Sequence, residues 1–327
     1  MKQLVKMRGL SVSFKGVPVL HGIDLDIYPG QALGLVGESG CGKSLTWLAA
    51  LGLLPTEAQI AGSVLLEETE LSNAPRRLLE TVRGRRIAMI FQDPSSALNP
   101  VLRVGRQICE ALQLHCGLRG DSARKEAIRL MDEVGIPDAA GRFDRYPHEF
   151  SGGQCQRLMI AMALAGKPDL LIADEPTTAL DATIQAQILD LLDQLRRDRG
   201  MALVFISHDL GAVAQICGRI AVMYAGRIIE EGPVDELFDW PRHPYTRGLF
   251  DAIPRMEGPP LPLVPIPGTV PDPRGLPEGC AFAPRCADAR PLCAGVSPRL
   301  ETLPDGRRVA CTFPREKSSP TPVLEEA

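Results

Sequence analysis

The sequence predicts an α/β fold with a mainly parallel sheet, followed by a C-terminal extension of different composition. Through residues 1–253, short apolar runs alternate with segments of helical composition, which is typical of an α/β domain. Beyond residue 253 the composition changes sharply, because 16 of the 29 prolines lie between Pro254 and Pro322. Proline removes backbone N–H donors, so neither a helix nor a sheet continues through such a density. We therefore place a boundary at residue 253 and expect an extension over 254–327.

The elements of the first domain follow from these patterns in order. Residues 10–27 alternate apolar and polar side chains in short segments, which indicates an antiparallel β patch. Residues 104–145 contain no convincing strand, so we expect an inserted helical subdomain over about 100–165. The expected strands of the main sheet are 32–36, 87–91, 170–173, 202–206 and 220–224, and the expected helices are 43–54, 104–114, 154–165 and 183–197.

The bulk properties narrow the classes of function. The chain has 36 Lys and Arg against 40 Asp and Glu, without the concentrated positive charge that a phosphate backbone favours, so we expect no nucleic-acid partner. Its longest apolar runs, 45–54 and 158–165, are about half the length of a membrane-spanning helix. Charges interrupt the apolar residues at the N-terminus, unlike a secretion signal. These features favour a cytoplasmic protein.

A glycine-rich segment fits the pattern of a phosphate-binding loop. It follows an expected strand and opens an expected helix, and it reads Gly37-Glu38-Ser39-Gly40-Cys41-Gly42-Lys43-Ser44. Its glycines let backbone N–H groups turn inward around phosphate oxygens, and the helix N-terminus adds positive potential. Lys43 is expected at the β and γ phosphates of ATP and Ser44 at Mg²⁺. A glycine-rich turn with a chance lysine would not need the strand and helix in register.

An acidic pair supplies a partner for this loop. Residues Leu170–Ala173 read as a buried strand, whose end would present Asp174 to hydrated Mg²⁺ and Glu175 to an attacking water. The alternative is a strand that ends in two solvated acids. The presence of both motifs in one chain favours the catalytic interpretation.

The segment Phe150-Ser151-Gly152-Gly153-Gln154 lies just before the acidic pair and opens a helix. Ser-Gly-Gly-Gln alone is compatible with an ordinary helix N-cap after a turn, so its position is what makes it specific. At this position the chain resembles the ABC ATPase family, whose signature loop is Ser-Gly-Gly-Gln. The resemblance covers residues 1 to about 250 and implies an ABC-type P-loop ATPase domain.

Other positions of the family match one by one. Gln92 follows the expected strand 87–91, Ala179-Leu180-Asp181 follows the acidic pair, and His208 follows the strand 202–206. Each would be ordinary polar surface alone, and their order carries the resemblance. Phe14 is placed against the adenine ring, where the family often has tyrosine. A plain core role for Phe14 is the alternative.

The resemblance implies a mechanism that needs two subunits. Such ATPases pair head to tail, so Ser151 and Gly153 of one subunit would cap the ATP held by the phosphate-binding loop of the other. Glu175 would be the base for in-line attack of water, and His208 would hold the γ-phosphate. Asp181 would communicate across the dimer, and Gln92 would link the metal site to the membrane partner.

The extension holds four of the nine cysteines, and the other five are scattered at Cys41, Cys109, Cys116, Cys155 and Cys217. The four read Cys280-x5-Cys286-x6-Cys293-x17-Cys311, which is not the Cys-x-x-Cys of common zinc ribbons. In a reducing compartment, four thiols in a segment with little apolar content suit an iron–sulfur cluster or structural zinc. Four unrelated thiols are the alternative.

The extension narrows the resemblance to the ATPase subunits of dipeptide and oligopeptide importers. The matching segments are Gln92–Pro100, His243-Pro-Tyr-Thr246, Val264–Pro273 and Ala283-Pro-Arg-Cys286. In that family the four cysteines hold a [4Fe–4S] cluster, which is implied here for Cys280, Cys286, Cys293 and Cys311, with zinc as the alternative. Members of the same broad group import nickel, glutathione or other small solutes, so the substrate stays open.

The resemblance also implies partners. They are a second ATPase subunit (a paralogue or a second copy), two integral membrane permease subunits and an extracytoplasmic solute-binding protein. The chain would be peripheral, at the cytoplasmic face of the inner membrane. The competing class is a soluble ABC ATPase of translation or DNA repair. Those proteins usually carry two cassettes or long insertions, whereas this chain has one compact cassette.

Overall fold

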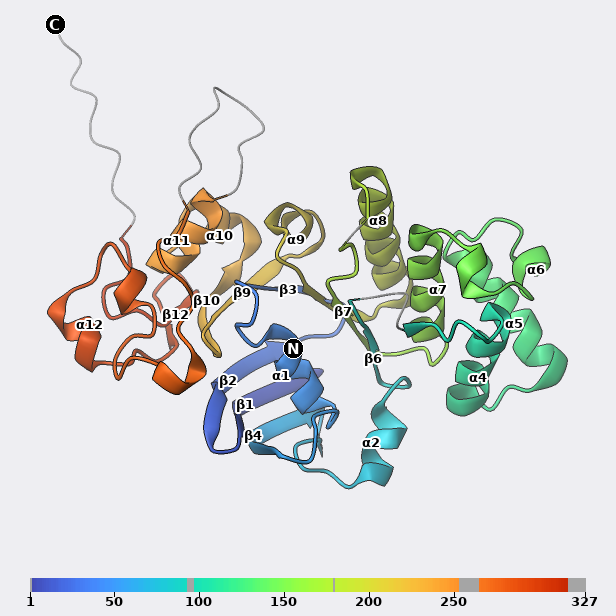
Figure 1. Cartoon of the computed structure of the whole chain (residues 1–327), viewed down its shortest axis with the longest axis horizontal. Coiled ribbons are helices and arrows are strands. Elements are labelled where there is room, and N and C mark those ends of the chain that lie inside the picture. Colours follow the sequence, from blue (N-terminus) through green and yellow to red (C-terminus); the bar gives the residue numbers. More distant parts are fainter. Residues whose placement is uncertain (1, 93–96, 179, 253–264, 317–327) are drawn as a thin grey trace, which may run out of the picture.

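The structure is a computed structural model that describes residues 2–92, 97–178, 180–252 and 265–316. Figure 1 shows two sheets at the centre, a group of helices at one end and residues 265–316 of the extension packed at the other. This arrangement confirms the predicted α/β fold with an antiparallel patch and a helical subdomain. No helix within the described ranges is long and apolar enough to cross a membrane.

The smaller sheet is antiparallel and has the strand order β2-β1-β4-β5. Its long pair, β1 (Val5–Phe14) and β2 (Val17–Ile27), extends the predicted patch toward the N-terminus. The sequence interpretation did not include β4 (Ala58–Leu66) and β5 (Thr69–Glu70), which complete it. Buried residues alternate along β1 and β2, as expected of a sheet with one face on the core.

The larger sheet has the order β11-β12-β10-β9-β3-β8-β7-β6, and β9, β3, β8, β7 and β6 are parallel. The strands β3 (Ala32–Val36), β7 (Leu170–Asp174) and β8 (Ala202–Ile206) are buried throughout, as strands covered on both faces must be. Their neighbours are β6 (Ile87–Ile90) and β9 (Arg219–Tyr224). All five lie within a residue or two of the predicted strands.

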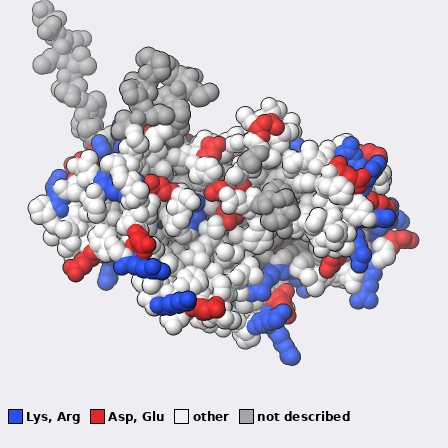
Figure 2. All heavy atoms as spheres, viewed as in Figure 1, with Lys and Arg blue, Asp and Glu red and all other residues white. Residues whose placement is uncertain are grey.

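Helices cover this sheet and form the subdomain. Beside the sheet lie α1 (Lys43–Ala50), α2 (Arg76–Val82), α8 (Ala182–Arg199), α9 (Leu210–Ile216), α10 (Val234–Asp239) and α11 (Pro244–Asp251). The subdomain consists of α4 (Val104–Cys116), α5 (Gly120–Glu133), α6 (Ala139–Arg142) and α7 (Gly152–Leu164). On the face shown in Figure 2, acidic and basic side chains lie beside one another. Within α5, Arg129 forms ion pairs with Glu126 and Glu133.

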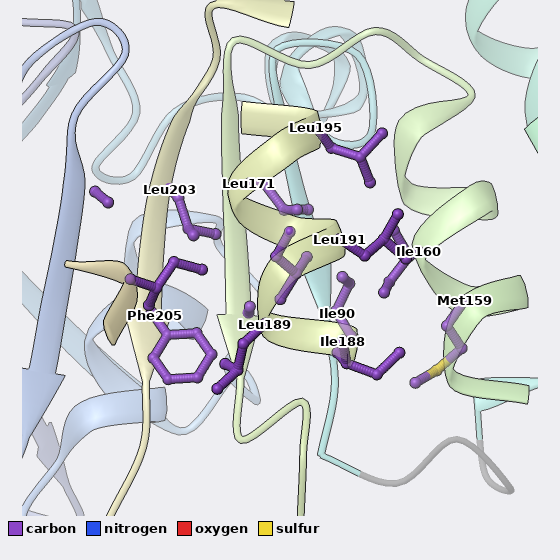
Figure 3. Packing of buried hydrophobic residues seen from close by; sticks show 14 of the residues in the cluster. Ile90, Met159, Ile160, Leu171, Ile188, Leu189, Leu191, Leu195, Leu203 and Phe205 are labelled. Atoms are coloured by element: carbon purple, nitrogen blue, oxygen red, sulfur yellow. The ribbon is translucent and has the colours of Figure 1, made fainter. Parts of the chain in front are cut away.

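The hydrophobic core lies in two layers because side chains alternate across each strand. Leu171, Leu203 and Phe205 point to one face and pack with α7 and α8, as Figure 3 shows. Leu170 and Val204 point to the other face, toward α1 and the small sheet. Both layers meet at the large sheet, so its carboxyl edge is held rigidly.

The extension packs onto this sheet and shares its core. Strand β12 (Arg308–Val309) pairs antiparallel with β10 (Arg227–Pro233), and β11 (Glu301–Thr302) pairs with β12. Phe282 is buried in the core layer that also holds the subdomain. The remaining helical pieces are the short α12 (Pro291–Gly295) and single turns at Pro273–Gly275 and Ala283–Arg285. The predicted boundary at residue 253 lies outside the described residues.

Candidate nucleotide-binding site

The phosphate-binding loop connects β3 to α1 at the carboxyl edge of the large sheet. Two glycines are required by close approach and backbone conformation. A Cβ on Gly37, whose φ is +149°, would lie 2.3 Å from the carbonyl oxygen of Met223. Gly42, with φ at +107°, precedes α1, and a Cβ there would lie 2.5 Å from Leu20. The loop is therefore pressed against β9 and β2 and opens toward solvent on its other side.

Lys43 begins α1 and is buried within the loop. Its Nζ donates hydrogen bonds to the carbonyl oxygens of Gly37 (2.8 Å) and Glu38 (3.1 Å). The ammonium group thus lies inside the turn, where a phosphate would meet it together with the N-terminus of α1. Its contact with the β and γ phosphates stays a prediction.

Ser44 and Asp174 come together at the start of α1 and the end of β7. Burial raises the pKa of Asp174, the hydrogen bond from Ser44 opposes this shift, and the charge of Glu175 adds to it. A hydroxyl beside a buried carboxylate suits Mg²⁺, which takes one or two protein ligands plus phosphate oxygens. The charge of a bound cation would keep Asp174 ionised.

Glu175 lies at the centre of a polar cluster beyond β7. Its backbone is left-handed (φ +48°), and its N–H donates to the carbonyl of Ile206 at 2.9 Å. The Nε2 of Gln92 donates to its Oε2 at 2.8 Å, and the hydroxyl of Thr178 donates to the same oxygen at 3.0 Å. The Nδ1 of His208 lies 3.5 Å from its Oε1. Three residues singled out in the sequence therefore meet here.

Sequence reasoning missed Thr178. Its position three residues after Glu175, at the end of the turn that follows the acidic pair, was the available signal. Its hydroxyl and the amide of Gln92 fix one carboxylate oxygen of Glu175 from two sides.

One cavity of about 780 Å³ joins these groups, a size suited to a nucleotide. Lys43, Ser44, Gln92, Glu175 and His208 line it. Its other walls come from the small sheet, the β9–β10 turn and the extension, and their residues are Val19, His21, Ala225, Gly226, Val270, Pro271, Pro273 and Leu276. The contribution from the extension was not predicted.

Phe14 lies elsewhere. It ends β1, is partly buried and packs against the core layer of the small sheet. It is not among the residues that line the cavity, where Val19 and His21 represent the small sheet instead. Its contact with adenine stays a prediction.

The signature loop is held by reciprocal hydrogen bonds. The Oγ of Ser151 accepts from the N–H of Gln154 (3.3 Å), and the Oε1 of Gln154 accepts from the N–H of Ser151 (3.2 Å), which forms a capping box on α7. Ser151 and Gly152 are exposed, and a Cβ on Gly153 would lie 2.6 Å from Ile184 of α8. None of these residues lines the cavity of the same chain.

Asp181 caps the N-terminus of α8, the helix that lies against the signature loop. Its Oδ1 accepts from the N–H of Ile184 at 3.0 Å, at the start of α8. Ala179, the first residue of its predicted motif, lies outside the described residues, as do 93–96 of the Gln92–Pro100 segment and Val264 of the Val264–Pro273 segment.

The four extension cysteines surround one small cavity, together with Phe282 and Phe313. The N–H of Cys280 donates to the carbonyl of Cys293 at 2.8 Å, which brings these two segments together. Burial raises the pKa of Cys280 and Cys286, and that of Cys311 to about 11. Across the described part of the chain, no group of three or more His, Cys, Asp or Glu side chains is placed to hold a metal ion.

This architecture defines a P-loop ATPase domain with a signature loop on its surface. The sequence profile described as "ABC transporter" matches residues 20–178, and that described as "Oligopeptide/dipeptide transporter, C-terminal region" matches residues 229–293. The chain belongs to the ABC transporter family, as an ATP-hydrolysing, ATP-binding subunit.

Relatives match nearly the whole chain. It is 46% identical to the oligopeptide transport ATP-binding protein OppD of Haemophilus influenzae, over 97% of this chain and 99% of the relative. It is 45% identical to the dipeptide transport ATP-binding protein DppD of Bacillus subtilis, over 95% of both chains. A solved dimeric, post-hydrolysis structure of the ATP-binding cassette MJ0796, bound to ADP and phosphate, superposes with a TM-score of 0.62 at 26% identity, covering 70% of this chain and 98% of that one.

Proposed function

We propose that the chain hydrolyses ATP to energise the import of dipeptides or oligopeptides through a membrane ABC transporter. The observation that carries this proposal is the similarity to oligopeptide and dipeptide transport proteins over nearly the full length of the chain, extension included. The ATP site alone does not distinguish peptides from other solutes, because it contacts only the nucleotide.

The geometry around Glu175 supports its role as the base that accepts the proton of the attacking water. Gln92 and Thr178 hold one carboxylate oxygen, so the other is left to face the cavity beside His208. His208 then holds the γ-phosphate, and Lys43 binds the phosphates from within the loop. Mg²⁺, held by Ser44, Asp174 and Gln92, would neutralise charge on the phosphate oxygens. Positioning of these groups supplies most of the catalysis.

A second ATPase subunit completes the site in this proposal. The signature loop is exposed and lies outside the cavity of its own chain, so it is available to cap the nucleotide of another. Asp181 begins α8 on the same surface and would face the partner. The relative MJ0796 was solved as a dimer with ADP and phosphate. A second copy or a paralogue would serve, because this chain carries the residues of both halves of a site.

An apolar groove supports contact with the permease subunits. It has a volume of about 670 Å³ and lies between β6, α4 and α7. Leu53 and Phe91 are 41% and 44% exposed there, and Met159 and Met162 form part of its wall. Phe91 immediately precedes Gln92, so a permease segment seated here would lie next to the residue that holds Glu175. The chain would thus be peripheral, at the cytoplasmic face of the membrane, and would act with a solute-binding protein through the complex.

The cysteine cavity supports a proposal for a [4Fe–4S] cluster held by Cys280, Cys286, Cys293 and Cys311. Four thiols lining one cavity would supply the donors of such a cluster, or of structural zinc, after they move closer together, because as they lie in the described residues they are not placed to hold a metal ion. Anaerobic purification followed by iron and acid-labile sulfide analysis separates the two. Four iron and four sulfide per chain are expected for the cluster; stoichiometric zinc without iron would refute it.

Uptake of labelled di- and oligopeptides tests the proposed substrate class. A strain that lacks this subunit should lose uptake, and the gene for the wild-type chain should restore it. Normal peptide uptake with lost uptake of nickel, glutathione or another small solute would point to that solute instead. Co-purification tests the transporter itself: recovery of ribosomes or repair factors without an integral membrane subunit would favour the soluble class of ABC ATPase.

A further inference from the structure

The phosphate-binding loop is held from the extension through its second residue, Glu38. Arg285 donates from Nη1 to one carboxylate oxygen of Glu38 at 2.8 Å and from Nη2 to the other at 2.9 Å. The two residues are 247 positions apart in the sequence. Two parallel hydrogen bonds between a guanidinium and a carboxylate fix the distance and the orientation of both groups.

Arg285 is itself fixed. Only 5% of its side chain is exposed, and its Nε donates to the carbonyl of Pro267 at 2.8 Å. Its guanidinium carbon lies 5.7 Å from the ring centroid of Tyr224 and 6.0 Å from that of Phe282. The Tyr224 and Phe282 rings contact each other edge to face. The packed rings of Tyr224 and Phe282 thus limit the orientations that the Arg285 guanidinium can adopt beside the loop.

Tyr245 holds the backbone of the same loop residue. Its hydroxyl oxygen accepts the N–H of Glu38 at 2.9 Å, and the whole side chain is buried. Its ring packs against both Tyr224 and Phe282. Side chain and backbone of Glu38 are therefore both held by residues that come after β10 in the chain, from the His-Pro-Tyr-Thr and Pro-Arg-Cys segments.

The position of Glu38 matters because Lys43 donates a hydrogen bond to its backbone carbonyl. Lys43 donates to the carbonyls of Gly37 and Glu38, so the peptide units on both sides of Glu38 shape the turn that receives the phosphates. A buried ion pair seldom adds net stability, because removing both charges from water costs about as much as their attraction returns. The Arg285–Glu38 pair instead fixes the position of the phosphate-binding loop, and phosphate binding depends on that position.

We propose that Arg285 is a positioning residue of the ATP site, which fixes the phosphate-binding loop through Glu38 and thereby makes ATP affinity depend on the extension. The next residue, Cys286, lines the cysteine cavity, so the segment that carries Arg285 connects that cavity to the phosphate-binding loop. The inference rests on ATP binding and is independent of which solute is imported.

The test compares conservative variants of the full-length chain. Arg285→Lys keeps the charge but loses the two-pronged contact, and Glu38→Gln keeps the shape but loses the charge. We expect each to weaken binding of a non-hydrolysable ATP analogue with Mg²⁺ about tenfold by calorimetry. The double variant should be little worse than either single one, because both remove the same contact. Steady-state assays should show a higher KM for ATP with kcat nearly unchanged.

Arg308→Lys is the matched control. Arg308 also belongs to the extension and also pairs with a carboxylate of the first domain, since its Nη1 lies 2.9 Å from Oε2 of Glu231, but it does not line the ATP cavity. This variant should bind the analogue as the wild type does. Wild-type affinity in Arg285→Lys and Glu38→Gln would overturn the proposal, as would equal weakening in Arg308→Lys. Melting temperatures verify folding, and Glu38→Gln decides alone if Arg285→Lys does not fold.

Discussion

The side-chain amide of Gln92 donates a hydrogen bond of 2.8 Å to Glu175, so the ends of two neighbouring strands are joined at the proposed catalytic base. The pairing of β6 with β7 sets this contact, because Ile90 lies opposite Ala173 and each chain then continues by two residues to the contacting side chain. Gln92 also follows directly on Phe91, in the wall of the apolar groove. A movement of Phe91 in that groove would therefore reach the proposed base, Glu175, through the hydrogen bond from Gln92.

Glu175→Gln tests the base. Glutamine keeps the shape of the side chain and its contacts with Gln92 and Thr178 but does not accept a proton. We expect hydrolysis to fall by about 10²–10⁴-fold with ATP binding retained. Phosphate release and equilibrium ATP binding measure the two effects separately. Hydrolysis at the wild-type rate would remove Glu175 from this role.

Lys43→Ala tests the phosphate contact. The buried ammonium group is the positive charge within the loop, so its loss should weaken ATP binding by about tenfold or more. Lys125→Ala, at an exposed position of α5, removes the same charge far from the cavity and should bind ATP normally. Unchanged affinity in Lys43→Ala would contradict the assignment of the loop.

Alanine substitution at two glycines of the loop should lower the free energy of unfolding by different amounts. Gly37 and Gly40 both have positive φ, so alanine strains either backbone by about 1 kcal/mol. At Gly40 the new methyl group meets no atom within 4 Å, whereas at Gly37 it lies 2.3 Å from the carbonyl of Met223. The clash should therefore make Gly37→Ala about 1–3 kcal/mol more destabilising than Gly40→Ala. Urea unfolding of both variants measures the difference, and equal losses would show that the loop relaxes freely.

His243 predicts a pH dependence of stability. It is fully buried, and its Nδ1 accepts the N–H of Tyr245 at 3.0 Å, which requires a neutral ring. Burial lowers its pKa from an ordinary 6.5 to about 3. Between these values the unfolded chain binds the proton and the folded chain does not. The free energy of unfolding should therefore fall as pH drops below 6.5, by about 1.4 kcal/mol per pH unit from this residue.

His243→Asn provides the comparison for that slope. Asparagine also accepts a hydrogen bond at a helix N-terminus, but it does not titrate. Glu230, whose carboxylate accepts the N–H of residue 243, is present in both proteins, so its own titration largely cancels. Urea unfolding at pH 7.5 and 5.5 should show a smaller loss for the variant. Parallel losses would mean that His243 does not control the slope.

Local patterns were enough to predict the main strands and the motif segments that bring Lys43, Gln92 and Glu175 to the cavity. A buried parallel strand is a continuous apolar run, so β3, β7 and β8 were identified directly, and residues that follow such strands share one edge of the sheet. The helix α5 was expected only as part of a subdomain, because its large apolar residues come only in its second half and its first buried positions are alanines. Helix α1 is shorter than predicted and ends at Ala50, although apolar residues continue to Leu54.

The role of the extension could not be predicted in the same way. Its composition indicated a segment without a core of its own, and the structure shows that it uses the core of the first domain. The contacts of Arg285 with Glu38 and of β12 with β10 join residues far apart in the sequence, and no local periodicity encodes such pairs. The same holds for Val270 and Leu276 in the wall of the ATP cavity.

The pairing of β12 with β10 has a consequence for synthesis of the chain on the ribosome. Glu231 of β10 and Arg308 of β12 are 77 residues apart, which corresponds to roughly 4–15 s of translation. During that interval the outer edge of β10 has no strand to pair with, and an open edge invites pairing with other chains. A nascent chain that stalls before residue 308 would thus expose the unpaired edge of β10 to other chains.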